Sequence, residues 1–172
     1  MNGLPEFSKG YFERFSTEPV TIKPFDPQSR VVARKYKDRL ERLLEPYGLK
    51  AAHRGSTYFG ICGKGEVELG IYPKNEDWYR VVVAMINYYK AIGNLDNEYA
   101  RFNDSLNGFE IEVILMTGHS AIVDRKLNEY LNTRPNLLKE YETVKSKYAF
   151  SKREYMTEKD KFLRKVIAEI PE

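Results

Sequence analysis

The chain of 172 residues has few of the residues that build metal or disulfide sites. Its single cysteine, Cys62, excludes an intramolecular disulfide. Only two histidines, His53 and His119, accompany it, so a closed structural zinc site is not expected. The formal net charge is only +3, from 28 basic and 25 acidic residues. Bulk attraction to nucleic acid or to a membrane is therefore not expected, and any positive site must be a local patch.

Long apolar runs are also missing. No stretch is long and apolar enough to span a bilayer, and the first residues lack the basic and apolar regions of a signal peptide. Hydrophobic residues make up 42% and charged residues 31%, which is typical of a soluble globular protein. The sequence therefore predicts a cytoplasmic protein with no membrane partner. Its oligomeric state is left open.

The chain length suits one domain. Residues 1–25 are interpreted as a leader, mobile or packed at an edge, with one short apolar stripe. The stripe consists of Phe7, Tyr11, Phe12 and Phe15. Residues 26–172 are expected to form a single domain, of which 119–172 is a helical tail.

Periodicity and turn residues predict both helices and strands in this domain. The Asn107-Gly108 pair is the strongest hairpin signal. The fold class expected is α+β: a small mixed sheet with flanking helices and a C-terminal helical tail. The expected order is a helix from Asp26 that ends by Gly48, a strand at 49–53, a loop at 58–65, a strand at 66–72, a helix between 75 and 93, strands at 99–103 and 109–116, and three helices that open at Ser120, Arg134 and Ser151.

A Gly55-Ser56 pair follows the first expected strand and precedes a glycine-rich loop. Small residues let backbone N–H groups approach a phosphate closely, and a serine hydroxyl adds a donor. The alternative is a plain tight turn, which is common for this pair. A catalytic triad around Ser56 is rejected, because His53 is too close in sequence. His53 is instead expected to be a structural hydrogen-bond partner, and His119, in a loop, is given no role.

Two expected strands carry carboxylates in an acid-x-acid pattern. The side chains of Glu66 and Glu68 lie on one face of the strand expected at 66–72. Those of Glu110 and Glu112 lie on one face of the strand expected at 109–116. Each pair alone is typical of an exposed polar strand face. Adjacent strands would bring the acids together, however, and a hard cation such as Mg²⁺ or Mn²⁺ prefers such oxygen ligands. Without a cation, mutual repulsion is expected to raise the pKa values of these carboxyl groups.

The order of these features resembles the nucleotidyltransferase superfamily and, within it, the GrpB family. The resemblance covers most of residues 22–168. Pro24-Phe25-Asp26-Pro27 is similar to the family's Pro-Tyr-Asp-Pro, and His53-Arg54-Gly55-Ser56-Thr57 to its His-Ile-Gly-Ser-Thr. Lys64 before the acidic strand and Glu68 resemble its Lys-Pro-Ile-Ile-Asp. The tail residues that follow the family's order are Tyr130, Leu131, Pro135, Asn136, Tyr141, Glu142, Lys145, Tyr155, Lys159 and Phe162.

The resemblance implies Mg²⁺-dependent transfer of a nucleoside monophosphate from an NTP to an unidentified small-molecule or protein acceptor. It implies catalytic roles for Glu66, Glu68 and Glu112, and metal binding by these three and Glu110, with Glu110 or Glu112 as the third ligand. The phosphate-binding residues implied are Gly55, Ser56, Thr57, Lys64, Lys145 and Lys159.

The chain departs from the family's pattern in three ways. It has Glu where the superfamily usually has Asp, its loop before Lys64 is one residue shorter, and Glu110-Ile111-Glu112 replaces the family's His-x-His. The alternative function is a non-catalytic module of the same fold that binds a nucleotide or phosphometabolite. An RNA-binding role is disfavoured by the modest charge and the clustered acids.

Overall fold

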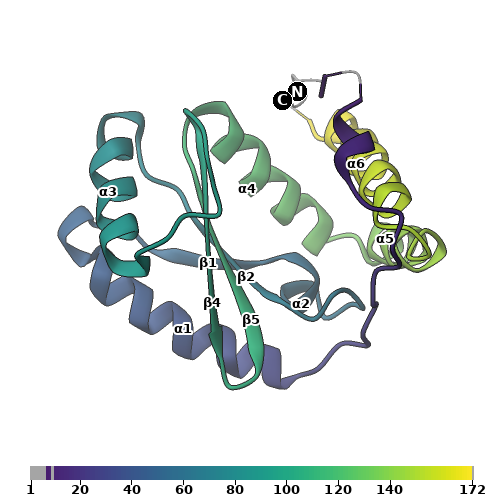
Figure 1. The fold of residues 1–172 in the computed structure, drawn as a ribbon, viewed down its shortest axis with the longest axis horizontal. Coiled ribbons are helices and arrows are strands. Elements are labelled where there is room, and N and C mark those ends of the chain that lie inside the picture. Colours follow the sequence, from purple (N-terminus) through teal and green to yellow (C-terminus); the bar gives the residue numbers. More distant parts are fainter. Residues whose placement is uncertain (1–6, 9, 172) are drawn as a thin grey trace.

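A five-stranded mixed sheet is the centre of the molecule. The computed structural model describes residues 7, 8 and 10–171 (Figure 1). The strands lie in the order β1-β2-β5-β4-β3, with β2 and β5 parallel and all other neighbours antiparallel. Their bounds are β1 (Ala51–Arg54), β2 (Val67–Ile71), β3 (Asn94–Leu95), β4 (Tyr99–Leu106) and β5 (Phe109–Met116).

Helices cover both faces of this sheet, as Figure 1 shows, with α1 and α3 on one side and α4, α5 and α6 on the other. The α-helices are α1 (Gln28–Leu44), α2 (Gly55–Phe59), α3 (Trp78–Tyr89), α4 (Gly118–Asn132), α5 (Pro135–Lys147) and α6 (Lys152–Glu169). Three short 3-10 helices are η1 (Tyr11–Arg14), η2 (Glu45–Tyr47) and η3 (Asn75–Asp77). The predicted α+β class is confirmed. In the part of the chain that is described, no helix is long and apolar enough to cross a membrane.

The main hydrophobic core lies between the sheet and the α1–α3 layer. Val32, Tyr36 and Leu40 recur at helical spacing on α1 and are buried. They belong to the same core as Leu69 of β2 and Val113 of β5. The opposite faces of β2 and β5 therefore carry Glu68 and Glu112, as the period of two predicts.

The N-terminal leader packs along the helical tail, as Figure 1 shows for η1 beside α6. The Val20 N–H donates to the Ala149 carbonyl at 2.7 Å. Lys23 and Gly63 exchange two backbone hydrogen bonds of 2.7 and 3.1 Å. The described part of the leader, residues 7, 8 and 10–25, thus links the tail to the loop between α2 and β2. The rest of the leader expected at 1–25 lies outside the described residues.

Three local predictions are wrong. The segment 58–65 is not loop throughout, because α2 continues to Phe59. Helix α4 begins at Gly118, so His119 is helical and Ser120 is not its cap. Ser120 instead donates from its N–H and its hydroxyl to the Glu98 carboxylate, at 3.2 and 3.0 Å. The backbone N–H groups in the first turn of a helix lack partners within the helix, and a side chain next to the helix start often accepts from them. Here the carboxylate of Glu98, from outside the helix, accepts from one of these N–H groups.

Candidate functional site

The face of the sheet that carries Glu68 and Glu112 opens into a cavity of about 810 Å³, here called the sheet cavity. Helices α4 and α6 and the leader complete its walls. A second cavity of about 820 Å³, the loop cavity, lies between the leader and the α2–β2 loop. Lys64 and Glu66 line both cavities, so they stand where the two meet.

Glu68 and Glu112 are direct partners in the parallel register of β2 and β5. The two acid-bearing strands are therefore neighbours, as predicted, and one acid of each pair meets the other on a shared face. Glu112, not Glu110, stands beside Glu68, since Glu110 is exposed and lines only the loop cavity. This arrangement favours Glu112 as the third carboxylate.

Basic side chains neutralise these acids. Lys64 pairs with Glu66 at 2.6 Å and Arg101 pairs with Glu112 at 3.3 Å. Burial alone would raise the pKa of Glu68, but Arg54 and Lys159 outweigh it, so this pKa is lowered. The expectation that repulsion raises all these pKa values is therefore wrong for Glu68.

Glu112 behaves as expected. Burial raises its pKa, and the negative charges of Glu68 and Glu66 add to that effect. The partly exposed Arg101 only partly offsets them. One carboxylate of the register pair thus keeps its charge while the other takes up a proton more readily.

The strand-to-helix turn at Gly55 sits directly against Glu68. Gly55 has a φ of 74°, which L residues rarely adopt, and a Cβ there would collide with the Glu68 carboxylate. The next residue, Ser56, accepts a hydrogen bond from the Lys145 ammonium at 2.8 Å. Lys145 also donates to the Cys62 carbonyl. The turn, the acids and the tail are therefore in direct contact.

Two lysines of the tail, Lys145 and Lys159, lie at the site, and their pKa values are shifted in opposite directions. Lys145 is only 1% exposed, and burial lowers its pKa to about 8. Lys159 lines the sheet cavity, and its pKa is raised by Tyr141, with Tyr155, Glu68 and Glu66 contributing. The tail closes over the acidic face.

His53 has a structural role. Its Nε2 lies 3.0 Å from the Thr57 hydroxyl, which donates at 3.2 Å to the Glu66 carbonyl. Burial lowers the pKa of His53 to about 4. A neutral imidazole thus helps hold the turn, and through Thr57 the start of β2.

The sequence interpretation missed three charged residues of the site: Arg54, Arg101 and Asp124. Arg54 pairs with Asp124 at 2.5 Å, and Tyr72 donates to the same carboxylate at 2.7 Å. These contacts join the sheet to α4. The sequence does indicate that Asp124 is buried and needs a partner, because it lies on the apolar stripe of its helix with Val123 and Leu127.

Glu66, Glu68 and Glu112 offer only oxygen atoms, the ligands that Mg²⁺ prefers. Among residues 7, 8 and 10–171, no three His, Cys, Asp or Glu side chains are grouped closely enough to hold a metal ion together. The donor set fits Mg²⁺ in its oxygen chemistry, and two of its members, Glu68 and Glu112, are register partners on one face of the sheet. The Lys64–Glu66 and Arg101–Glu112 ion pairs would have to open for it to bind.

The fold is of the nucleotidyltransferase type. A protein chain from the "structure of GLD-2/RNP-8 complex" is similar, with a TM-score of 0.50 and 16% sequence identity, over 86% of this chain and 61% of that one. This chain thus spans less than two thirds of that neighbour. A Leishmania infantum polymerase beta from a ternary complex gives a TM-score of 0.45 and 8% identity, over 80% of this chain and 56% of that one.

The family is more specific than the fold. The model of the GrpB protein family matches residues 19–169, so the chain belongs to this family. No curated protein sequence matches the chain.

Proposed function

We propose that the protein transfers a nucleoside monophosphate from an NTP to an acceptor hydroxyl, with Mg²⁺ bound at the acidic face. The observation that carries this is the register pairing of Glu68 with Glu112 beside the Gly55-Ser56 turn. Glu68 and Glu112 line the sheet cavity, Ser56 and Thr57 line the loop cavity, and Lys64 and Glu66 line both. Carboxylates and phosphate donors thus border the region where the two cavities meet, and such a transfer needs both.

The phosphate groups are held by the turn and the lysines. Ser56 accepts from Lys145, so its own hydroxyl hydrogen points away from that ammonium and is available to a phosphate oxygen. Gly55 and Thr57 contribute backbone N–H groups, and Lys64 and Lys159 add charge where they line the sheet cavity.

Glu66, Glu68 and Glu112 would hold Mg²⁺, which when bound neutralises phosphate charge and polarises the reacting oxygens. Glu112 then takes the proton of the acceptor hydroxyl on a carboxylate oxygen. In the metal-free protein, burial and the charges of Glu68 and Glu66 raise the pKa of Glu112, so it is the stronger base of the register pair. Glu68, with its lowered pKa, stays ionised throughout.

Pyrophosphate release tests this proposal. The protein is incubated with each of the four NTPs, Mg²⁺ or Mn²⁺, and a mixture of hydroxyl-bearing acceptors. We expect metal-dependent release that is lost with EDTA and with Glu112→Gln. Glu110→Gln is the matched control, two residues away on β5 and lining only the loop cavity, and it should retain most of the activity. Equal loss in both variants would contradict the assignment of Glu112.

A second function is favoured by the ion pairs. Because Lys64 and Arg101 already neutralise Glu66 and Glu112, the site is stable without a metal and can hold a phosphate-bearing ligand as it stands. This is a non-catalytic binding module for a nucleotide or phosphometabolite. Calorimetry and the pyrophosphate assay together distinguish the enzyme from the binding module. The module binds NTP in EDTA by calorimetry, and it releases no pyrophosphate under any metal condition.

A further inference from the structure

The leader contributes one wall of the sheet cavity. Phe7, Tyr11, Arg14 and Phe15 line the same cavity as Glu68, Glu112 and Lys159. These leader residues precede the 19–169 span that the family model matches. The wall therefore lies outside the span that the family model matches.

Three of these side chains form a continuous stack. The Phe7 and Tyr11 rings are stacked with centroids 3.9 Å apart and an interplanar angle of 14°. The Arg14 guanidinium carbon lies 3.7 Å from the Tyr11 centroid. Two groups this close cannot occupy the same face of one ring, so Phe7 and Arg14 cover opposite faces of Tyr11. The guanidinium thus terminates the stack.

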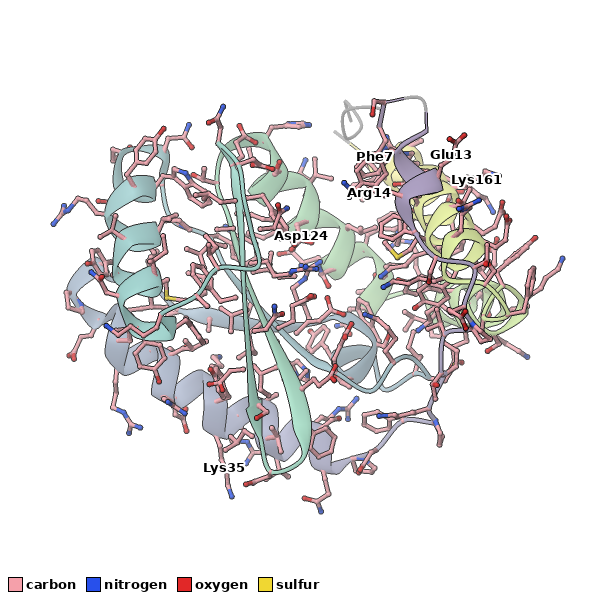
Figure 2. The ribbon with its side chains drawn as sticks, viewed as in Figure 1. Phe7, Glu13, Arg14, Lys35, Asp124 and Lys161 are labelled. Carbon is pink, nitrogen blue, oxygen red and sulfur yellow. The ribbon has the colours of Figure 1, made fainter. Side chains whose placement is uncertain are left out.

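The end of the stack faces the cavity. In Figure 2, Phe7 and Arg14 lie on the side of η1 that faces α4 and Asp124, whereas Glu13 and Lys161 lie on the opposite side. Arg14 is exposed, and among the described residues no carboxylate forms an ion pair with it. The guanidinium carbon also lies 5.2 Å from the Phe15 centroid, and Arg14 lines the sheet cavity.

The wall is anchored, although it comes from the leader. Arg153 of α6 donates to the Phe15 carbonyl at 3.2 Å and to the Glu13 carbonyl at 2.9 Å. These bonds fix both ends of the turn that carries Arg14. A wall that is ordered before binding costs a ligand less conformational entropy.

We propose that the Arg14 guanidinium, backed by Tyr11 and Phe7, stacks on the nucleobase of the nucleotide whose phosphates lie at Lys64 and Lys159, which line the same cavity. This inference rests on the proposed function. A cavity of about 810 Å³ with acids and lysines at one part and a planar cationic stack at another suits a ligand with an anionic end and a flat ring. Guanidinium planes and aromatic rings are the groups on which proteins stack bases.

Affinities for ATP and for inorganic tripolyphosphate, which has no base, separate the stacking contribution from the phosphate contribution. Isothermal titration with wild type should show tighter binding of ATP. Arg14→Lys keeps the charge and removes the planar surface. We expect it to weaken ATP binding about tenfold, the size of a base-stacking contribution, and tripolyphosphate binding less than about twofold.

Glu13→Gln is the matched control, one residue away on the opposite side of η1, and should leave both affinities unchanged. Equal binding of ATP and tripolyphosphate by wild type overturns the stacking inference and leaves the proposed function standing. So does an equal loss for both ligands in Arg14→Lys, since Arg14 would then act on phosphate. Binding of neither ligand by wild type removes the proposed function, and the base subsite with it.

Discussion

Glu68 and Glu112 face each other across two parallel strands, yet their pKa values are shifted in opposite directions. Both carboxyl groups lose solvation on folding, which raises both pKa values. Arg54 and Lys159 more than offset this at Glu68, whereas Glu112 also experiences the negative charges of Glu68 and Glu66. The difference between two chemically identical groups is thus set by the cations around one of them, and it underlies the separate roles proposed for them.

Glu68→Gln should destabilise the protein by about 2 kcal/mol at pH 7, because it removes the counter-charge of partly buried cations. A lowered pKa means that this contribution is present above the ordinary carboxyl value of 4.5 and is lost as the pH falls through the folded-state value. Urea unfolding at pH 7 and pH 3 measures it. The gap between wild type and variant should be full at pH 7 and reduced at pH 3.

Glu112→Gln should change stability at pH 7 by less than about 1 kcal/mol, or increase it. The change relieves repulsion from Glu68 and Glu66, and the Arg101 partner that it gives up is 40% exposed, where an ion pair contributes little. The same unfolding curves test this. A Glu112→Gln variant that loses several kcal/mol would show that the carboxylate is a structural partner.

Lys145 should give the stability a distinct dependence on alkaline pH. Its pKa of about 8 lies below the ordinary lysine value of 10.5, so between these values the unfolded chain binds more protons than the folded one. Stability therefore rises with pH in this window, by up to about 1.4 kcal/mol per pH unit. Lys145→Met should lack that slope. Unfolding at pH 7.5, 8.5 and 9.5 checks it, and parallel curves for the two proteins would refute it.

The periodicity of the sequence predicts which residues share a face, and it predicts the common face of Glu68 and Glu112 because strand alternation is a local property. It does not predict their charge state. Asp124 reaches Arg54 across 70 positions, and Lys145 reaches Ser56 across 89, so no local pattern places them together. The pKa of Glu68 departs from its expected direction for this reason, because Arg54 and Lys159 come from other elements and no local pattern of the strand includes them.

Gly63→Ala should disturb the turn through packing alone. A Cβ at Gly63 would lie 2.7 Å from both Cβ and Oγ of Ser56 and 3.6 Å from the Lys145 ammonium. We expect a loss of about 1–3 kcal/mol, as for overpacking in a filled interior. Ser56→Gly removes the atoms that collide, so adding Gly63→Ala to that background should cost much less. A double-mutant cycle by thermal unfolding tests this, and additive losses would contradict it.

The Lys64–Glu66 ion pair separates the two functional proposals. If Glu66 is a metal ligand, the Lys64 ammonium 2.6 Å from its carboxylate competes with the cation. Lys64→Met should then tighten Mg²⁺ or Mn²⁺ binding in the absence of nucleotide. It should also increase the thermal stabilisation that millimolar metal produces. A ligand that binds only the native state stabilises it by RT ln(1 + [L]/Kd), so a lower Kd gives more stabilisation. Lys74→Met removes an exposed lysine that lines neither cavity and is the control. If the protein is instead a metal-free binding module, Lys64 serves the phosphate directly. The same variant would then leave the metal response absent and weaken NTP binding in EDTA, because a phosphate contact is lost and the Glu66 charge is left uncompensated beside the ligand.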